Sequence, residues 1–213
     1  ESKKVELLEF RSLRITEQGP LRLRLETHWR TPHRSTVTQN ILMYHKSPRI
    51  DFRTRIIWNE KTILLKAAFP LNLNASHATY EIQFGALQRS AKPKTPEDKA
   101  KFEVPAQQWA DMSDTKFGVS LLNDAKYGYD ARENVLRLTL LRSPRFPHPI
   151  DPAKQTDSTA TDQGKQEFTY SLFPHAGDWT RGDTVRRARE LNHPLLLLDA
   201  MSKHPSPLFV SLR

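Results

Sequence analysis

Polar and aromatic side chains gather in one short stretch between two apolar runs, Val119 to Leu122 and Val135 to Leu141. The stretch combines a carboxamide, an amine, carboxylates, phenol rings and a glycine: Asn123, Asp124, Lys126, Tyr127, Gly128, Tyr129 and Asp130. Such groups supply donors, acceptors and ring faces for a polar, ring-shaped ligand, and the glycine permits a tight bend. The alternative is a hairpin loop whose tyrosines pack on its own base, because β proteins often have loops of this composition. In both interpretations two strands flank one loop.

The sequence contains no other recognisable catalytic or metal-binding pattern. Its eight histidines occur singly, at His28, His33, His45, His77, His148, His175, His193 and His204. None has another histidine or a carboxylate at a spacing typical of metal ligands, so we expect surface or loop histidines and no metal site. A glycine-rich phosphate loop, a GxSxG elbow and an HExxH helix are all missing. Asp124 and Asp130 are a candidate carboxylate pair for glycoside chemistry, but nothing in the sequence brings them together, and we expect no catalytic residue.

Charge and composition restrict the class of partner. The 213 residues carry a formal net charge of +9 at pH 7, which invites a nucleic-acid interpretation. The basic groups, such as Arg22 with Arg24, are separated along the chain and mixed with acids, so we expect a solvated basic surface and no nucleic-acid partner. No run of eighteen apolar residues is present, which predicts no membrane span. The absence of cysteine suits a reducing compartment, and the expected location is cytoplasmic.

Hydrophobic periodicity predicts strands along most of the chain. Leu21 to Trp29 alternates strictly between apolar and charged residues, which is typical of a half-buried strand. Ten to twelve such segments are expected, among them Val5–Ile15, Leu21–Trp29, Val37–His45, Ile50–Ile56, Thr62–Phe69, Ala78–Phe84, Val135–Leu141, Gln166–Phe173, Leu195–Leu198 and Leu208–Leu212. The proline-containing segment from Arg89 to Asp114 predicts at most a short helical turn at Pro96 to Lys101.

One segment near the C-terminal end has a helical period. Val185, Ala188 and Leu191 recur at helical spacing, and Asp178 or Thr180 could cap a helix that runs to Asn192. The residues 151–165 include no large apolar side chain and predict a mobile surface loop. We therefore expect an all-β fold with two stacked antiparallel sheets and one short C-terminal helix, and residues 1–213 as a single domain.

Four sequence blocks resemble one enzyme family. They are ATYEIQFGALQR (78–89), KFEVPAQQWADMSDTKFGVSLLNDAKYGYD (101–130), NVLRLTLLRSPRFP (134–147) and DQGKQEFTYSLFPHAGDW (162–179). Together they are similar to the C-terminal β domain of family-38 glycoside hydrolases, the α-mannosidases, in particular the cytosolic and bacterial branch. The resemblance implies a large antiparallel sandwich of the supersandwich, galactose-mutarotase-like type. It also implies a retaining, zinc-dependent parent enzyme that hydrolyses terminal α-mannosidic bonds in glycans.

The resemblance further implies which parts of such an enzyme this chain lacks. In the family, the zinc ligands and the nucleophilic aspartate belong to an N-terminal α/β barrel, which is followed by a helical bundle, and neither has a counterpart here. We therefore expect this fragment to be inactive alone and to hold no cofactor. Its expected partners are the barrel and bundle of the same polypeptide and a mannose-containing glycan.

In this family the β domain lends polar residues to the edge of the sugar site. The expected substrate-binding residues are Asn123, Asp124, Lys126, Tyr127, Tyr129 and Arg142. Arg142 ends the apolar run before Pro144, and its planar guanidinium suits sugar hydroxyls or a carboxylate that orients them. The alternatives are a surface ion pair for Arg142 and a loop that caps its own hairpin.

A different class of function is an independent carbohydrate-binding or scaffolding module. In that case the faces of Tyr127, Tyr129, Trp109 and Trp179 would stack on sugar rings, although aromatic residues of a β domain are more often core or loop anchors.

Overall fold

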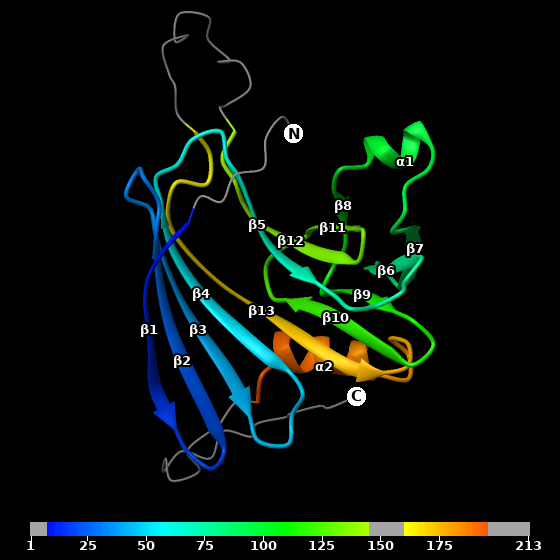
Figure 1. Cartoon of the computed structure of the whole chain (residues 1–213), viewed down its shortest axis with the longest axis horizontal. Helices are drawn as coiled ribbons and strands as arrows, with labels where there is room; N and C mark the ends of the chain where they lie inside the picture. The colour runs from blue at the N-terminus through cyan, green and yellow to red at the C-terminus, as the bar shows by residue number, and fades with distance from the viewer. Residues whose placement is uncertain (1–7, 145–159, 196–213) are drawn as a thin grey trace, which may run out of the picture.

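Two antiparallel β-sheets form the protein, as a computed structural model of residues 8–144 and 160–195 shows (Figure 1). These two ranges contain thirteen strands and two short helices. The predicted all-β architecture of two stacked antiparallel sheets is confirmed. The predicted strand 208–212 and most of the strand predicted at 195–198 lie outside the described residues.

The larger sheet has nine strands in the order β1-β2-β3-β4-β13-β10-β9-β6-β7, and each neighbouring pair is antiparallel. Its strands are β1 (Glu9–Gln18), β2 (Arg22–Arg30), β3 (Thr36–Tyr44), β4 (Ile50–Trp58), β13 (Gly164–Ala176), β10 (Phe117–Asn123), β9 (Trp109–Ser113), β6 (His77–Ile82) and β7 (Gly85–Ser90). The strict alternation in the sequence of β2 places Leu23 and Leu25 on the inner face and Arg24 on the outer face, since successive strand residues point to opposite sides.

The smaller sheet has four strands in the order β5-β12-β11-β8. They are β5 (Leu64–Pro70), β12 (Val135–Arg142), β11 (Gly128–Arg132) and β8 (Val104–Pro105). The main core lies between this sheet and the middle of the larger one, where Trp58, Leu121, Tyr129, Leu136 and Leu138 are fully buried. Packing of Phe69 on Phe52 and of Tyr129 against Tyr80 shows that the small sheet covers the large one from β4 to β6.

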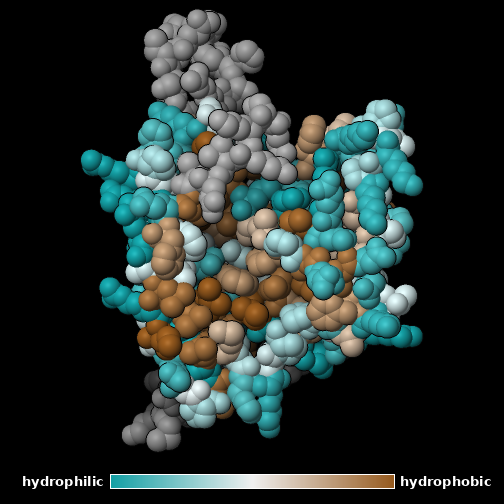
Figure 2. All heavy atoms as spheres, viewed as in Figure 1, coloured by the Kyte–Doolittle hydropathy of each residue, from teal (hydrophilic) through white to brown (hydrophobic). Residues whose placement is uncertain are grey.

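The large sheet therefore extends beyond the small sheet on both sides. On one side, β1 to β3 have no strand of the small sheet in front of them (Figure 1). Apolar residues gather on this inner face over the first four strands (Figure 2). Phe10, Leu13 and Ile15 on β1 are 51%, 54% and 58% exposed. On the other side, β7 and the segment that carries helix α1 (Pro96–Ala100) flank β8 (Figure 1).

Helix α2 (Thr184–Asn192) packs on the outer face of the large sheet over β9 and β10. It buries Ala188 against Trp109, Leu122 and Phe173 in a second core cluster. The helix predicted from Thr180 is confirmed, but it begins four residues later, at Thr184. The cause is a turn in which the Asp178 carboxylate accepts hydrogen bonds from the backbone N–H groups of Thr180 and Arg181.

Several boundaries differ from the prediction. The predicted irregular segment Arg89 to Asp114 contains β9, which is only five residues long and buried on both faces, so it shows no alternation. Most of the predicted loop 151–165 lies outside the described residues, and from Gly164 the chain is already in β13. The predicted turn at Pro96 to Lys101 forms helix α1, whose first turn is capped because the Thr95 hydroxyl accepts a hydrogen bond from the Asp98 N–H.

Candidate functional site

The loop between the two apolar runs connects the two sheets. β10 belongs to the nine-stranded sheet, whereas β12 pairs with β11 and β5 in the four-stranded sheet. Strands therefore flank the loop as expected, but the alternative in which they form a hairpin is wrong. A short connection, residues 124–127, crosses from one sheet to the other, and Gly128 already begins β11. Strand β11 was not predicted from the sequence, because only two of its residues, Tyr129 and Ala131, lie on the inner face, and two positions are too few to show alternation.

Asn123 and Tyr129 anchor the two ends of this connection inside the core. They are 1% and 0% exposed. The Asn123 side-chain amide donates hydrogen bonds to the Tyr129 hydroxyl and to the Gln107 carbonyl oxygen, and its oxygen accepts one from the Lys126 N–H. Burial raises the pKa of the Tyr129 phenol, so the hydroxyl stays protonated. Both of these expected substrate-binding residues are thus enclosed by protein in this structure.

Asp124, Lys126 and Tyr127 lie on the outside of the connection. Both carboxylate oxygens of Asp124 accept hydrogen bonds from the Thr169 N–H, at 2.9 and 3.0 Å, which tie the connection to β13. The Lys126 ammonium lies 4.3 Å from the centroid of the Phe168 ring, and burial lowers the pKa of Lys126 against the opposing charges of Asp162 and Asp124. Tyr127 is 58% exposed. Lys126 and Tyr127 are thus the groups of the loop that a ligand can reach.

Arg142 lies at the end of β12, at the same end of the molecule as Lys126. The Arg142 N–H donates a hydrogen bond of 3.1 Å to Asp162, the carboxylate whose charge also acts on Lys126. The Arg142 side chain is exposed, and its guanidinium makes no hydrogen bond or ion pair with any other described residue. It lines an open depression of about 650 Å³ together with Ile63, Phe102 and Glu103. Asp162 thus lies near both Arg142 and Lys126, although Lys126 does not line this depression.

Gly128 is needed where Glu103 crosses the small sheet. The Glu103 carboxylate passes directly over Gly128 to accept a hydrogen bond from the Thr139 hydroxyl on β12, and a Cβ at position 128 would collide with it. The glycine that suggested a bend instead provides space for a side chain from the neighbouring strand.

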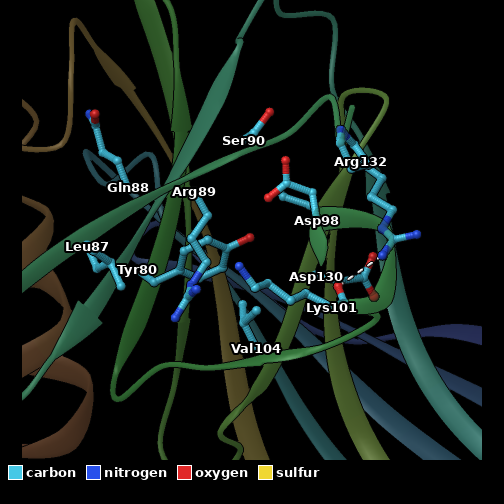
Figure 3. A pocket seen from close by; sticks show the side chains of 12 residues that line it. Tyr80, Leu87, Gln88, Arg89, Ser90, Asp98, Lys101, Val104, Asp130 and Arg132 are labelled. Carbon is cyan, nitrogen blue, oxygen red and sulfur yellow. Dashed lines mark hydrogen bonds between the residues drawn. The ribbon is translucent and has the colours of Figure 1, made fainter. Parts of the chain in front are cut away.

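A second cavity, of about 240 Å³, lies between β6, β7, β8, β11 and α1 (Figure 3). Tyr80, Arg89, Asp98, Lys101 and Arg132 are among the residues that line it. Burial raises the pKa of Tyr80 and the Asp130 charge adds to this rise, while Arg89 and Arg132 oppose it. This cavity was not predicted from the sequence. The only signal was an arginine, Arg89, at an inward position of the alternating segment Gly85–Ser90.

Asp130 separates this cavity from the outer face of the small sheet. Its carboxylate accepts hydrogen bonds of 2.6 Å from Lys66 and 2.7 Å from Arg137. Asp130 is almost fully buried, whereas Asp124 is exposed and bonded to β13. The structure therefore gives the two carboxylates separate roles and does not bring them together as a pair.

A buried polar cluster joins α2 to the large sheet. The His175 Nε2 lies 2.8 Å from Asp111 and 3.1 Å from the Ser120 hydroxyl, which also contacts the Thr184 hydroxyl at 2.6 Å. His175 was expected on the surface or in a loop and is instead buried within β13, because Gly118 and Gly182 leave room for its ring. Ser120 is fully buried and meets the same nitrogen as Asp111, so these residues do not form a nucleophile–base relay.

The described part of the chain contains neither a metal-binding cluster nor a membrane-spanning helix. No group of three or more histidine, aspartate or glutamate side chains is placed there to hold a metal ion. None of its helices is long and apolar enough to cross a membrane. Among the aromatic residues considered for sugar stacking, Trp109 packs against Trp179 at 5.0 Å beneath α2 and Tyr129 is buried, which leaves Tyr127 exposed.

Sequence and structure comparisons place the chain among known proteins. Residues 1–150 match the family described as "Glycosyl hydrolases family 38 C-terminal domain". The chain is 42% identical over 172 residues to alpha-mannosidase 2C1 of Homo sapiens, which covers 81% of this chain and 16% of that protein. It is 36% identical to alpha-mannosidase G of Dictyostelium discoideum, over 93% of this chain and 18% of the relative.

The fold is also known from a solved structure. An alpha-mannosidase from Enterococcus faecalis superposes with a TM-score of 0.74 at 16% identity, over 88% of this chain and 24% of that one. The chain thus spans less than a fifth of the length of the two curated relatives named above. On the match over residues 1–150 and on 36–42% identity to these relatives, the chain belongs to the C-terminal domain family of glycosyl hydrolases 38.

Proposed function

We propose that this chain is the non-catalytic β domain of an α-mannosidase that hydrolyses terminal α-mannosidic bonds in glycans. The parent enzyme is a retaining, zinc-dependent hydrolase, and this domain packs on its catalytic part. The described residues offer no cluster of histidines and carboxylates that fits zinc, so other residues of the longer polypeptide would hold the metal. The cytoplasm remains the proposed location.

The observation that carries the proposal is the uncovered apolar face of β1–β3, which continues to Phe52 and Ile50 at the edge of β4. Cross-strand partners on this face form apolar rows, Ile15–Leu25–Ile41–Phe52 and Leu23–Met43–Ile50. Soluble monomers rarely expose a continuous apolar patch of more than a few hundred square ångströms, so such a face marks an interface.

The polar residues within this face do not require water as a partner. The Gln39 amide donates hydrogen bonds of 2.7 Å to the Tyr170 hydroxyl and 3.1 Å to the Thr54 hydroxyl. Because these groups are already paired, another protein segment can cover the face without leaving them unsatisfied. The relatives are several times longer than this chain, and the remaining part of such a polypeptide is the proposed cover.

We further propose that Lys126, Tyr127 and Arg142 face the edge of the sugar site, with Asp124 holding the connection in place. Two observations support this. Tyr127 and Arg142 are exposed while Lys126 is half-buried, and the Arg142 guanidinium has no partner among the described residues. Asn123 and Tyr129 support this surface from beneath, because their hydrogen bond fixes the start of β11.

A kinetic experiment on the intact enzyme tests the sugar-site proposal. Arg142→Ala should lower kcat/KM on an aryl α-mannoside by one to three orders of magnitude, about 1.4 to 4 kcal/mol of transition-state stabilisation, while the melting temperature stays unchanged. The matched control is Arg53→Ala, which removes an exposed arginine on the outer face of β4. Equal kcat/KM for the two variants, or a loss that follows unfolding, would reject the role of Arg142.

The non-catalytic role has its own test. The purified chain, with or without added zinc, should not hydrolyse an aryl α-mannoside, whereas the intact enzyme should. Turnover that co-purifies with the chain and disappears on substitution of one of its own carboxylates would contradict the proposal.

A further inference from the structure

The cavity of Figure 3 contains polar groups that the protein itself leaves without partners. Tyr80 is 3% exposed, and its hydroxyl makes no hydrogen bond with any described residue. The Arg89 Nε is buried without a hydrogen-bond partner. The Lys101 ammonium, also on this cavity, has no ion pair in the described part of the chain. Figure 3 shows the side chains of Arg89 and Lys101 turned toward Tyr80.

An unsatisfied buried donor such as the Arg89 Nε costs about 1–3 kcal/mol, and the Tyr80 hydroxyl and the exposed Lys101 ammonium add two donors without partners among the described residues on the same cavity. Arginine and lysine are donors only, and the Tyr80 phenol stays protonated because burial raises its pKa. The missing partner is therefore an acceptor. A single ligand with several acceptor atoms would satisfy all three groups together.

The charges around the cavity select an anionic acceptor. Three cations line it, Arg89, Lys101 and Arg132, against two carboxylates, Asp98 and Asp130. Asp130 is already paired with Lys66 and Arg137, so it does not neutralise the lining cations. Arg132 is held in place because it donates hydrogen bonds to the carbonyl oxygens of Lys99 and Lys101, at 3.3 and 2.9 Å. The wall of the cavity thus carries a net positive charge, and one of its cations, Arg132, is fixed before any ligand enters.

We propose that this cavity binds a phosphate group, either free or carried by a sugar. The planar fork of Arg89 matches two phosphate oxygens, and Lys101 and the Tyr80 hydroxyl donate to the others. Asp98 is half-buried on the same cavity, and its carboxylate can accept hydrogen bonds from hydroxyl groups of an attached sugar. The proposal does not depend on the role proposed for Arg142, which lines the other depression.

Calorimetric titration of the intact protein with inorganic phosphate and with mannose 6-phosphate tests the proposal. Arg89→Gln should weaken binding roughly tenfold to hundredfold, and Lys101→Gln roughly threefold to tenfold, as expected for hydrogen bonds to a charged group. The matched control Arg53→Gln removes a positive charge from the outer face of β4 and should leave the affinity unchanged.

The two ligands distinguish the sources of the phosphate. Binding of both with similar affinity indicates a site for the phosphate alone, and tighter binding of mannose 6-phosphate that Asp98→Asn reduces indicates a sugar-carried group. Lys101 is exposed, so Lys101→Gln keeps the test valid if Arg89→Gln fails to fold. Absence of binding for both ligands, or an affinity that neither Arg89→Gln nor Lys101→Gln changes, would overturn the proposal.

Discussion

The two ends of the nine-stranded sheet extend beyond the small sheet in chemically opposite ways. At the β1–β3 end the inner face carries Leu25, Ile41 and Ile15, and nothing in the described residues covers Ile15. At the β6–β7 end the inner residues include Tyr80 and Arg89, and the α1 segment closes over them to form a charged cavity. An exposed apolar sheet face is stabilised when another protein segment buries it, whereas a small charged cavity suits a small ligand.

The largest expected effect tests the apolar end. Ile15→Glu should destabilise the intact enzyme by about 3 kcal/mol, because the interface would bury an unpaired carboxylate. In the 213-residue chain by itself the same change should shift stability by less than about 0.5 kcal/mol, since Ile15 is 58% exposed. Denaturant unfolding measures both, and Arg14→Gln on the outer face of the same strand is the control. A small effect in the intact enzyme would show that the face stays open.

An effect of intermediate size on stability is expected to distinguish Tyr80 from Tyr129, whose ring centroids lie 6.4 Å apart in the core. Tyr129→Phe should cost about 1–2 kcal/mol, because it removes the acceptor of the buried Asn123 amide. Tyr80→Phe should change the free energy of unfolding by less than about 0.5 kcal/mol, because the Tyr80 hydroxyl has no partner among the described residues. Thermal unfolding of the two variants without phosphate is the measurement. Equal losses of unfolding free energy in the two variants would mean that the Tyr80 hydroxyl is hydrogen-bonded within the protein. The contrast between the apolar and the charged end of the large sheet would then weaken.

The smallest expected effect concerns salt. Raising sodium chloride from 50 to 500 mM should weaken phosphate binding at the charged end about threefold to tenfold, because it screens Arg89 and Lys101. The denaturant midpoint of the intact enzyme should remain nearly constant, since apolar burial at the other end is not screened. Calorimetry and urea unfolding over the same salt series check both. A phosphate affinity that is independent of salt would contradict a charged site.

Local patterns in the sequence determined much of the fold. The alternation of Leu21 to Trp29 has the period of a strand and that strand is present, and the apolar spacing of Val185, Ala188 and Leu191 correctly marked α2. The four sequence blocks that resemble family-38 glycoside hydrolases identified the domain, because proteins with such similar sequences share one fold. The sequence also singled out the polar and aromatic cluster that begins at Asn123, and packing was one of the two interpretations of that cluster.

Only the tertiary structure decided how these pieces combine. Strand pairing depends on contacts between distant residues, so no local pattern showed that β10 and β12 belong to different sheets. The same reason explains why Arg89 and Lys101, which lie on a strand and after a helix, meet at one cavity. Tyr127 is exposed because it lies in the connection before β11, whereas Tyr129 is buried because it lies within β11 on the face that packs against the core, and no local pattern showed where this strand begins.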